Sequence, residues 1–264
     1  MKNLDIYNPF KALIYHEETV SSTMEISRQL ATVSAPHGTV ITADFQEAGY
    51  GRVSGRSWEM ERGLNLPFTI LLKYSRLEDI PPALTLRAGL AVSLAIEDFI
   101  SFLQSEREGS FVFVKWPNDI MIDSKKAAGI LCEADDGNVH LGIGINVMQS
   151  KFPEHLRDKA TSIVNAIKIA ENQHAQEKRF YLLERILVRL YDELETPAGA
   201  DWKTRLEQRL YKKDETVVFI DGAADSGKIV KGCLVGIGCG GELLIKPDGE
   251  KEERAFINGE LKIL

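Results

Sequence analysis

Cysteine, long apolar runs and excess positive charge are all scarce in this sequence. The three cysteines, Cys132, Cys233 and Cys239, cannot all pair, and their wide spacing fits no zinc motif. No apolar run reaches the roughly 18 residues that a membrane-spanning helix needs. The N-terminal segment up to Glu18 carries scattered charges where a signal peptide has an apolar core. These absences argue against a disulfide scaffold, a zinc finger and a membrane protein, and they predict a cytoplasmic protein with reduced thiols.

The charge balance narrows the range of partners. Asp and Glu together number 39, Lys and Arg 32, and the net charge is −7. An acidic surface disfavours non-specific binding to nucleic acid, although it leaves room for a local basic pocket that holds a phosphate. We expect no nucleic-acid and no membrane partner. With 264 residues, of which 44% are hydrophobic, the chain suits one large domain, or one domain with a small appendage.

Two hydrophobic periodicities alternate along the first part of the chain. Apolar residues at helical spacing predict helices over Ser22–Ala31 and Pro82–Leu103. The expected strands are Thr39–Phe45, Asn65–Tyr74, Phe111–Val114, Ile120–Ile122, Ala127–Glu133 and Val139–Val147. Because several strands follow one another through short turns, the pattern predicts an α+β fold, a mixed sheet with helices on one face.

Toward the C-terminus the pattern changes to two helices followed by short strands. Helices are expected at Phe180–Glu195 and Asp201–Tyr211, and short strands with glycine-rich turns follow from Thr216. About 50 residues of such strands predict a small SH3-like β-barrel. We therefore divide the chain into residues 1–211 and residues 212–264, with a helix that bridges the boundary.

A glycine-rich loop is the first candidate site. It runs from Gly49 through Gly51, Arg52 and Arg56 to Trp58, directly after an expected strand. Glycines allow backbone N–H groups to surround an anion, arginines add charge, and a tryptophan can cover a ring. The pattern is neither a dinucleotide fingerprint nor a phosphate-binding Walker loop. An exposed loop with solvated arginines explains the same residues equally well.

Two further segments place polar residues beside strands. Asn118 and Asp119 follow Lys115-Trp116-Pro117 at a strand end, where ligands of α/β sheets often bind, although a simple turn accounts for them as well. Lys126 precedes the small residues Ala127, Ala128 and Gly129, which leave room for a ligand. Read alone, it is a solvated lysine at a strand start.

The strand around residue 143 has two unlike faces. Leu141, Ile143 and Ile145 share one face, whereas Gly142, Gly144 and Asn146 share the other, because side chains alternate along a strand. A strand face without side chains is either a site of close packing or a floor for a flat ligand.

A capping box is expected at the start of the first helix. Ser22 would be the N-cap and Glu25 would occupy the third helical position. The helix N-terminus, with Ser22 and Thr23, could also meet a polar group of a ligand.

In their order, these segments resemble the biotin protein ligases. The matching pieces are Ser21-Ser22-Thr23 before a helix, Gln46 ahead of a Gly-x-Gly-Arg loop, Lys-Trp-Pro-Asn-Asp, Lys-x-x-Gly-Ile-Leu and Gly-Ile-Gly-Ile-Asn. The resemblance covers about residues 20–150. It implies a catalytic domain like that of class II aminoacyl-tRNA synthetases and a C-terminal SH3-like domain. The winged helix of members that double as repressors has no room before Ser21, so a monofunctional enzyme is expected.

The resemblance also implies a reaction and its components. Biotin and Mg-ATP would form biotinyl-5′-AMP, and a lysine of a biotin carboxyl carrier protein would then take the biotinyl group. ATP, Mg²⁺ and biotin are the expected small molecules, in a monomer or a homodimer. The implied catalytic residues are Lys126, Arg52 and Asp119. Biotin would contact Ser22, Thr23, Gln46, Gly49, Gly51, Lys126, Gly129, Gly142 and Gly144. ATP would contact Arg52, Arg56, Trp58, Asn118, Lys126 and Asn146, with Asn118 or Asp119 at the metal.

Three departures from the family pattern leave alternatives open. Tyr50 replaces the first arginine of Gly-Arg-Gly-Arg, one residue is added between Arg52 and Gly55, and Met24 stands where the family has asparagine. The missing charge predicts weaker retention of biotin or its adenylate, which the exchange Tyr50→Arg tests. The alternatives are a lipoate or octanoate ligase-transferase of the same fold and a catalytically silent biotin sensor.

Overall fold

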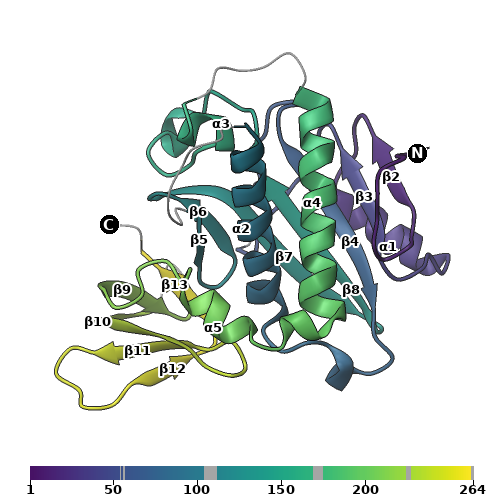
Figure 1. Cartoon of the computed structure of the whole chain (residues 1–264). Helices are drawn as coiled ribbons and strands as arrows, with labels where there is room; N and C mark the ends of the chain where they lie inside the picture. The colour runs from purple at the N-terminus through teal and green to yellow at the C-terminus, as the bar shows by residue number, and fades with distance from the viewer. Residues whose placement is uncertain (54, 56, 104–111, 169–174, 224–226, 263–264) are drawn as a thin grey trace.

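The larger part of the molecule is built on one eight-stranded mixed sheet (Figure 1). The computed structural model describes residues 1–53, 55, 57–103, 112–168, 175–223 and 227–262. The strand order is β1-β2-β3-β4-β8-β7-β6-β5. The strands are β1 (Lys2–Asn3), β2 (Ile14–Glu17), β3 (Thr39–Ala43), β4 (Leu66–Lys73), β5 (Val112–Lys115), β6 (Asp119–Ile122), β7 (Lys125–Asp135) and β8 (Asn138–Ile145). All pairs within this sheet are antiparallel except β2 with β3.

Two long helices, α2 (Leu84–Leu103) and α4 (Ala175–Glu195), cover one face of the sheet (Figure 1). Helix α1 (Thr23–Thr32) packs on the opposite face, where Ser27 Oγ lies 2.7 Å from His140 Nδ1. The predicted mixed sheet is confirmed, but its helices do not all lie on one face. The residues of β8 that turn away from the apolar core are small or polar, and α1 covers His140 and Gly142 among them.

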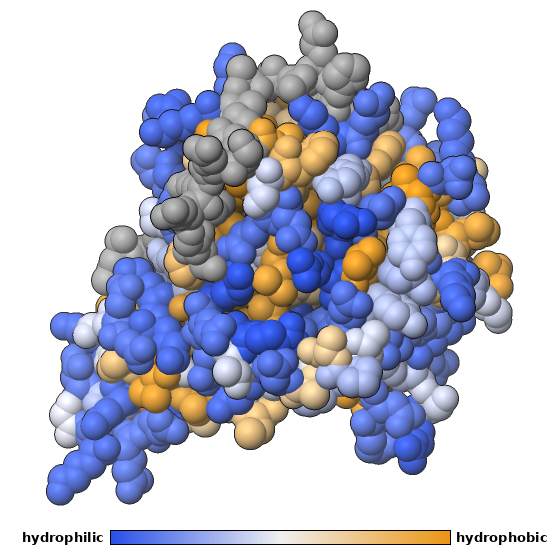
Figure 2. Space-filling view, viewed as in Figure 1, coloured by the Kyte–Doolittle hydropathy of each residue, from blue (hydrophilic) through white to orange (hydrophobic). Residues whose placement is uncertain are grey.

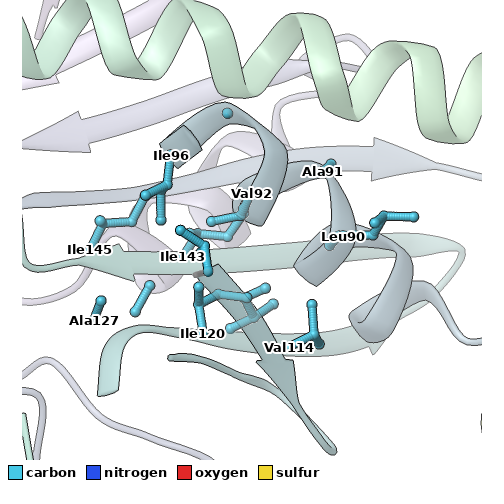
Figure 3. Close-up of a cluster of buried hydrophobic side chains, with 14 of the residues drawn as sticks. Leu90, Ala91, Val92, Ile96, Val114, Ile120, Ala127, Ile143 and Ile145 are labelled. Carbon is cyan, nitrogen blue, oxygen red and sulfur yellow. The ribbon is translucent and has the colours of Figure 1, made fainter. Parts of the chain in front are cut away.

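The core lies between α2 and the strands (Figure 3). Ile143 and Ile145 of β8 point toward α2, as their alternation with glycine predicts. The labelled side chains around them are all buried: Leu90, Ala91, Val92 and Ile96 from α2, and Val114, Ile120 and Ala127 from neighbouring strands. This layer fixes the face of the sheet that carries the glycines.

The remaining helices are short. They are α3 (Ile163–Ala166), α5 (Trp202–Glu207) and the 3₁₀ turns η1 (Leu77–Asp79), η2 (Glu154–Leu156) and η3 (Pro197–Gly199). Helix α5 ends before the predicted Tyr211 because the chain turns there to pair with β5. The Tyr211 amide donates to the Val114 carbonyl, and the Val114 amide donates to the Arg209 carbonyl.

The C-terminal part forms a separate five-stranded antiparallel sheet in the order β12-β11-β10-β9-β13. Its strands are β9 (Thr216–Asp221), β10 (Lys228–Ile237), β11 (Leu243–Pro247), β12 (Arg254–Phe256) and β13 (Gly259–Leu261). The predicted strands are present, whereas closure into an SH3-like barrel stays a prediction. Between Tyr211 and Asp214 the backbone passes from pairing with Val114 to pairing with Leu234. We keep residues 1–211 and 212–264 as the proposed domains.

The two sheets contact each other through Trp116, which follows β5. Its Nε1 donates to the Gly241 carbonyl at 2.9 Å, and its ring lies 5.8 Å from that of Phe219 of β9. The surface seen in Figure 2 is largely hydrophilic, with scattered hydrophobic areas. None of the helices in the described residues has the length and apolar character needed to cross a bilayer.

Candidate functional site

The face of β8 opposite the core is a backbone floor covered by two side chains. A Cβ added to Gly142 would lie 2.6 Å from Met24 Sδ of α1, and one added to Gly144 would lie 2.7 Å from Trp58 Cε2. Met24 and Trp58 therefore rest directly on the strand, which is possible only because glycine has no side chain. We call the backbone of Gly129, Gly142 and Gly144 the glycine floor.

Trp58 reaches this floor from the end of the glycine-rich loop. Its amide donates to the Gly49 carbonyl at 2.9 Å, and Tyr50 and Ser57 form an antiparallel bridge within the loop. The indole also lies against Gly129, whose added Cβ would be 3.3 Å from Trp58 Cζ3. Its Nε1 is buried and has no hydrogen-bond partner in the structure as described. A flat side chain thus lies where the sequence analysis expects a flat ligand.

Lys126 and Asp119 form an ion pair at the rim of the floor. Lys126 Nζ lies 2.6 Å from Asp119 Oδ1 and 5.8 Å from the centroid of the Trp58 ring. Asp119 opens β6 and pairs with Gly129 of β7. The Lys126 backbone is fixed on its other side, since its amide donates to Lys159 and its carbonyl accepts from Thr161. The structure thus brings a partly exposed cation, a carboxylate and an aromatic ring together.

A chain of polar groups lies at the other end of the floor. Gln46 Oε1 accepts hydrogen bonds from the Thr23 amide and hydroxyl, at 2.8 and 2.9 Å. The Thr69 hydroxyl of β4 donates to Thr23 Oγ1 at 2.9 Å. Thr69 pairs with Gly142 in the sheet, so this chain borders the floor. Sequence reasoning missed Thr69, because an isolated threonine within an apolar strand carries no signal of function.

The start of α1 differs in one detail from the predicted capping box. Ser22 is the N-cap, and its side chain accepts from the Met24 amide. Glu25 accepts instead from the hydroxyl of Ser21, so the reciprocal bond from Glu25 to the Ser22 amide is not formed. Ser22 remains buried close to Thr23, where it can meet the same ligand groups.

The two asparagines of the predicted nucleotide site donate side-chain hydrogen bonds to backbone carbonyls. Asn118 Nδ2 donates to the Ile130 carbonyl at 2.7 Å, and Asn146 Nδ2 donates to the Thr161 carbonyl at 3.1 Å. Asn146 Oδ1 is buried without a partner in the described part of the chain. Both side chains therefore shape the strands that carry Lys126, and their role toward a nucleotide stays a prediction.

Arg52 of the loop contacts the C-terminal sheet region. Arg52 donates to the Gly259 carbonyl at 2.9 Å and to Asn258 Oδ1 at 3.3 Å, both in the C-terminal sheet region. Arg56 lies outside the described residues. Gly51 lies within the loop. Gly49 packs against Gln46, because a Cβ added to Gly49 would lie 2.9 Å from Gln46 Nε2. The structure therefore joins the loop to the C-terminal sheet, a contact that no sequence pattern indicated.

A second anchor of the loop also escaped the sequence analysis. Arg28 Nη2 of α1 donates to the Tyr50 hydroxyl at 2.9 Å and forms an ion pair with Glu133 of β7. The Tyr50 hydroxyl lies 3.3 Å from Glu133 Oε2. Nothing in the local sequence around Arg28 or Glu133 marks them, because only the sheet topology brings them to Tyr50.

The metal-binding side chains at the site suit an ion that arrives bound to a ligand better than an ion held by the protein alone. Among the described residues, no group of three or more His, Cys, Asp or Glu side chains could hold an ion. Asp119 is one carboxylate, already paired with Lys126. Mg²⁺ is often held by one or two carboxylates together with substrate phosphates, and Asp119 fits that mode.

Taken together, these features define an α+β protein with a glycine-lined strand face and a lysine–aspartate ion pair at its rim. Residues 17–150 match the biotin/lipoate A/B protein ligase family, and the chain belongs to that family.

Relatives and solved structures agree with this assignment. The chain is 42% identical over 165 residues to the bifunctional ligase/repressor BirA of Bacillus subtilis. This match covers 58% of this chain and 46% of the relative. It is 34% identical over 152 residues to the biotin--[acetyl-CoA-carboxylase] ligase of Mycobacterium tuberculosis, covering 56% of this chain and 53% of that one. The chain thus spans about half the length of these curated relatives.

A solved structure extends the similarity to the whole fold. The biotin protein ligase of Aquifex aeolicus in complex with biotin and ATP superimposes with a TM-score of 0.71 at 26% identity. The match covers 96% of this chain and 98% of that one.

Proposed function

We propose that this protein is a biotin protein ligase. It activates biotin with ATP to biotinyl-5′-AMP and transfers the biotinyl group to a lysine of a biotin carboxyl carrier protein. The observation that carries the proposal is the Lys126–Asp119 pair, 2.6 Å apart beside the glycine floor. Family membership and the resemblance to an enzyme crystallised with biotin and ATP support it.

In the first step, a carboxylate oxygen of biotin attacks the α-phosphorus of ATP. The bond between the α- and β-phosphates breaks, and pyrophosphate leaves. Two anions must approach each other, so preorganised cations and backbone amides supply most of the catalysis. Lys126 would lie between the carboxylate and the α-phosphate; its ion pair with Asp119 at the rim of the floor supports this role.

The remaining groups bind and orient the two substrates. Thr23, Gln46 and Ser22 offer hydroxyl, amide and backbone groups to the polar ends of biotin, and its ring would lie at the glycine floor beside Met24 and Trp58. Arg52 would leave Gly259 and move to the phosphates or the adenylate when the substrates bind. A magnesium ion carried by ATP would neutralise phosphate charge, with Asp119 or Asn118 as its protein ligand.

In the second step, the amine of the carrier lysine attacks the acyl carbon, and AMP leaves. Asp119 would orient that amine. A loop that covers the floor also keeps water from the mixed anhydride. We further propose a cytoplasmic location, since the free cysteines Cys132, Cys233 and Cys239 fit a reducing compartment.

Pyrophosphate release tests the proposed reaction. The purified protein is given Mg-ATP with biotin, lipoate, octanoate or no acid. Biotin-dependent release supports the proposal, and labelling of a carrier domain then tests the transfer step. Release with lipoate or octanoate alone would contradict it and assign the chain to the sister activity. Biotin binding in calorimetry without any release would favour a sensor.

A further inference from the structure

Thr69 places a fully buried hydroxyl on the face of β4 that continues the glycine floor. It pairs with Gly142 across the sheet, and its Oγ1 lies 3.6 Å from the position that a Cβ on Gly142 would occupy. Its neighbours along the strand, Phe68 and Ile70, turn to the opposite face and belong to the apolar core. Because a buried hydroxyl needs a partner, the hydrogen bond from Thr69 to Thr23 of α1, at 2.9 Å, decides what this group can do.

The direction of the hydrogen bonds around Thr23 follows from one backbone group. The Thr23 amide can only donate, and it lies 2.8 Å from the side-chain amide of Gln46, so the atom that faces it is the carbonyl oxygen Oε1. That oxygen can only accept, and the Thr23 hydroxyl therefore donates to it, at 2.9 Å. Because Thr23 has used its hydrogen there, it can only accept from Thr69. The order of donors is thus fixed, from Thr69 through Thr23 to Gln46.

This order decides which polar atoms remain for a ligand. Gln46 keeps the two N–H donors of Nε2, on the side of the amide away from Thr23 and beside Gly49. Thr69 has given its hydrogen to Thr23, so its oxygen can only accept. A ring that carries a carbonyl beside an N–H, as a cyclic urea or a lactam does, matches both ends of the chain. An alkyl chain or a disulfide ring matches neither.

Met24 shields the Thr69 oxygen while the floor holds no ring. Its Sδ lies 2.6 Å from the position of a Cβ on Gly142, the same point that Thr69 Oγ1 approaches to 3.6 Å. Methionine has three rotatable bonds and adapts to irregular spaces, so this side chain can turn aside when a ring enters. The hydroxyl of Thr69 belongs to a rigid central strand and stays where it is.

We propose that Thr69 is a specificity-determining residue, which accepts an N–H of the ligand ring and fixes the Gln46 amide as the donor to the ring carbonyl. The inference rests on the proposed function and deepens it, because biotin carries a cyclic urea whereas lipoate and octanoate do not. Thr69 selects among carboxylic acids at the end remote from the carboxylate. It takes no part in the transfer of the acyl group.

Calorimetry with biotin tests the selection. Thr69→Val keeps the shape of the side chain and removes the hydroxyl, so the Kd for biotin should rise about tenfold, the ratio that corresponds to one net hydrogen bond. Thr69→Ser should bring the Kd back to within threefold of that of the unaltered protein. Octanoate, which has no N–H, should bind Thr69→Val no more weakly than it binds the unaltered protein. The kcat of pyrophosphate release at saturating biotin should stay within twofold, because the contact holds the ring equally in the ground state and the transition state.

Thr42→Val is the matched control. Thr42 is equally buried, but its hydroxyl donates to the Pro67 carbonyl at 2.8 Å, so this variant should leave the Kd for biotin unchanged. A Kd for biotin within twofold of that of the unaltered protein in Thr69→Val, or an equal rise in Thr42→Val, would overturn the assigned role.

The order of the chain has tests of its own. Gln46→Glu keeps an acceptor for Thr23 but cannot donate to a ring carbonyl, so the Kd for biotin should rise at least tenfold, and an unchanged Kd would contradict the order. In NMR spectra without ligand, the signals of the Thr23 amide and of the Gln46 side-chain amide should shift in Thr69→Val, because hydrogen bonds in a chain polarise one another. Both signals should return in Thr69→Ser and stay unchanged in Thr42→Val. If the unaltered protein binds no biotin, the proposed function fails, whereas the NMR shifts still decide whether Thr69 controls the chain.

Discussion

Lys126 is the side chain on which the proposed chemistry depends most directly. It stands partly exposed at the rim of the floor, with Asp119 as its ion-pair partner. Lys126→Ala should reduce pyrophosphate release to background, because the charge between the two reacting anions is gone. The free energy of unfolding of this variant should differ from that of the unaltered protein by less than about 1 kcal/mol, since partly exposed ion pairs contribute little to stability.

The neighbouring lysine supplies the control for this prediction. Lys125 Nζ donates to the Arg157 carbonyl, away from Asp119, so Lys125→Ala should retain its activity. Full activity in Lys126→Ala would remove that residue from the mechanism.

Gly144 is the residue at which the floor is most tightly covered. A Cβ there would meet the Trp58 ring at 2.7 Å, so Gly144→Ala should displace Trp58 and weaken biotin binding about tenfold in calorimetry. Stability should fall by no more than about 1 kcal/mol, because a loop side chain can move. In a Trp58→Phe background the same substitution should cost less. Equal losses in both backgrounds would show that Trp58 is not what the new methyl group meets.

Some site residues could be predicted from local sequence, and others could not. Lys126, Asp119 and Thr23 lie in motifs whose order along the chain is informative, and the structure brings each to the floor. Thr69, Arg28 and Glu133 reach the site only through strand pairing and helix packing, which no local pattern encodes. Tyr50 is an intermediate case, since its departure from the motif was visible but its partners were not.

At the scale of elements, a buried cluster joins strands β2 and β3 to helix α4. Arg179 of α4 is buried and donates to Asp44 Oδ1 at 2.8 Å and to the Asn65 carbonyl. His16 Nε2 of β2 lies 3.1 Å from the same Asp44 oxygen. Burial alone would raise the pKa of Asp44, but Arg179 and His16 outweigh it, and the pKa lies below its usual value.

This lowered pKa predicts how stability depends on pH. Because the folded pKa lies below the unfolded value of about 3.9, ionised Asp44 stabilises the fold above that pH, and the contribution is lost as the pH falls through the folded pKa. Asp44→Asn should cost about 3 kcal/mol at pH 7, since Arg179 stays buried without its carboxylate.

Denaturant titrations between pH 3 and pH 7 measure the effect. The difference between Asp44→Asn and the unaltered protein should shrink below about pH 4. Asp79→Asn, at an exposed ion pair with Arg76, is the control and should change stability little at any pH. A constant difference across the range would contradict the assigned pKa direction.

Elements with strong periodicity were predicted well, and short ones were not. Helix α2 and strands β4 and β8 follow their predicted ranges closely, because long amphipathic or apolar patterns leave few alternatives. Strand β2 was missed, since its four residues gain their structure from pairing with β3. The predicted end of α5 was wrong for the same kind of reason, because pairing of Leu210 with Val114 replaces the last helical turn.

At the scale of the whole molecule, Trp116 links the large sheet to the C-terminal sheet. Trp116→Phe keeps an aromatic ring near Phe219 but loses the donor to the Gly241 carbonyl. We expect a loss of about 1 kcal/mol, measured as a lower midpoint of thermal unfolding. An unchanged midpoint would mean that this hydrogen bond does not stabilise the junction.

The hydrogen bond between Arg52 and Gly259 joins residues that the ribosome adds at very different times. The two residues are 207 positions apart in the chain. At about 5–20 residues per second, a ribosome needs about 10 to 40 seconds to add the second after the first. During translation the arginine therefore emerges long before its carbonyl partner exists. Arg28 and Glu133, the partners of Tyr50, are synthesised much earlier, so this anchor of the loop has its partners available before Arg52 has Gly259.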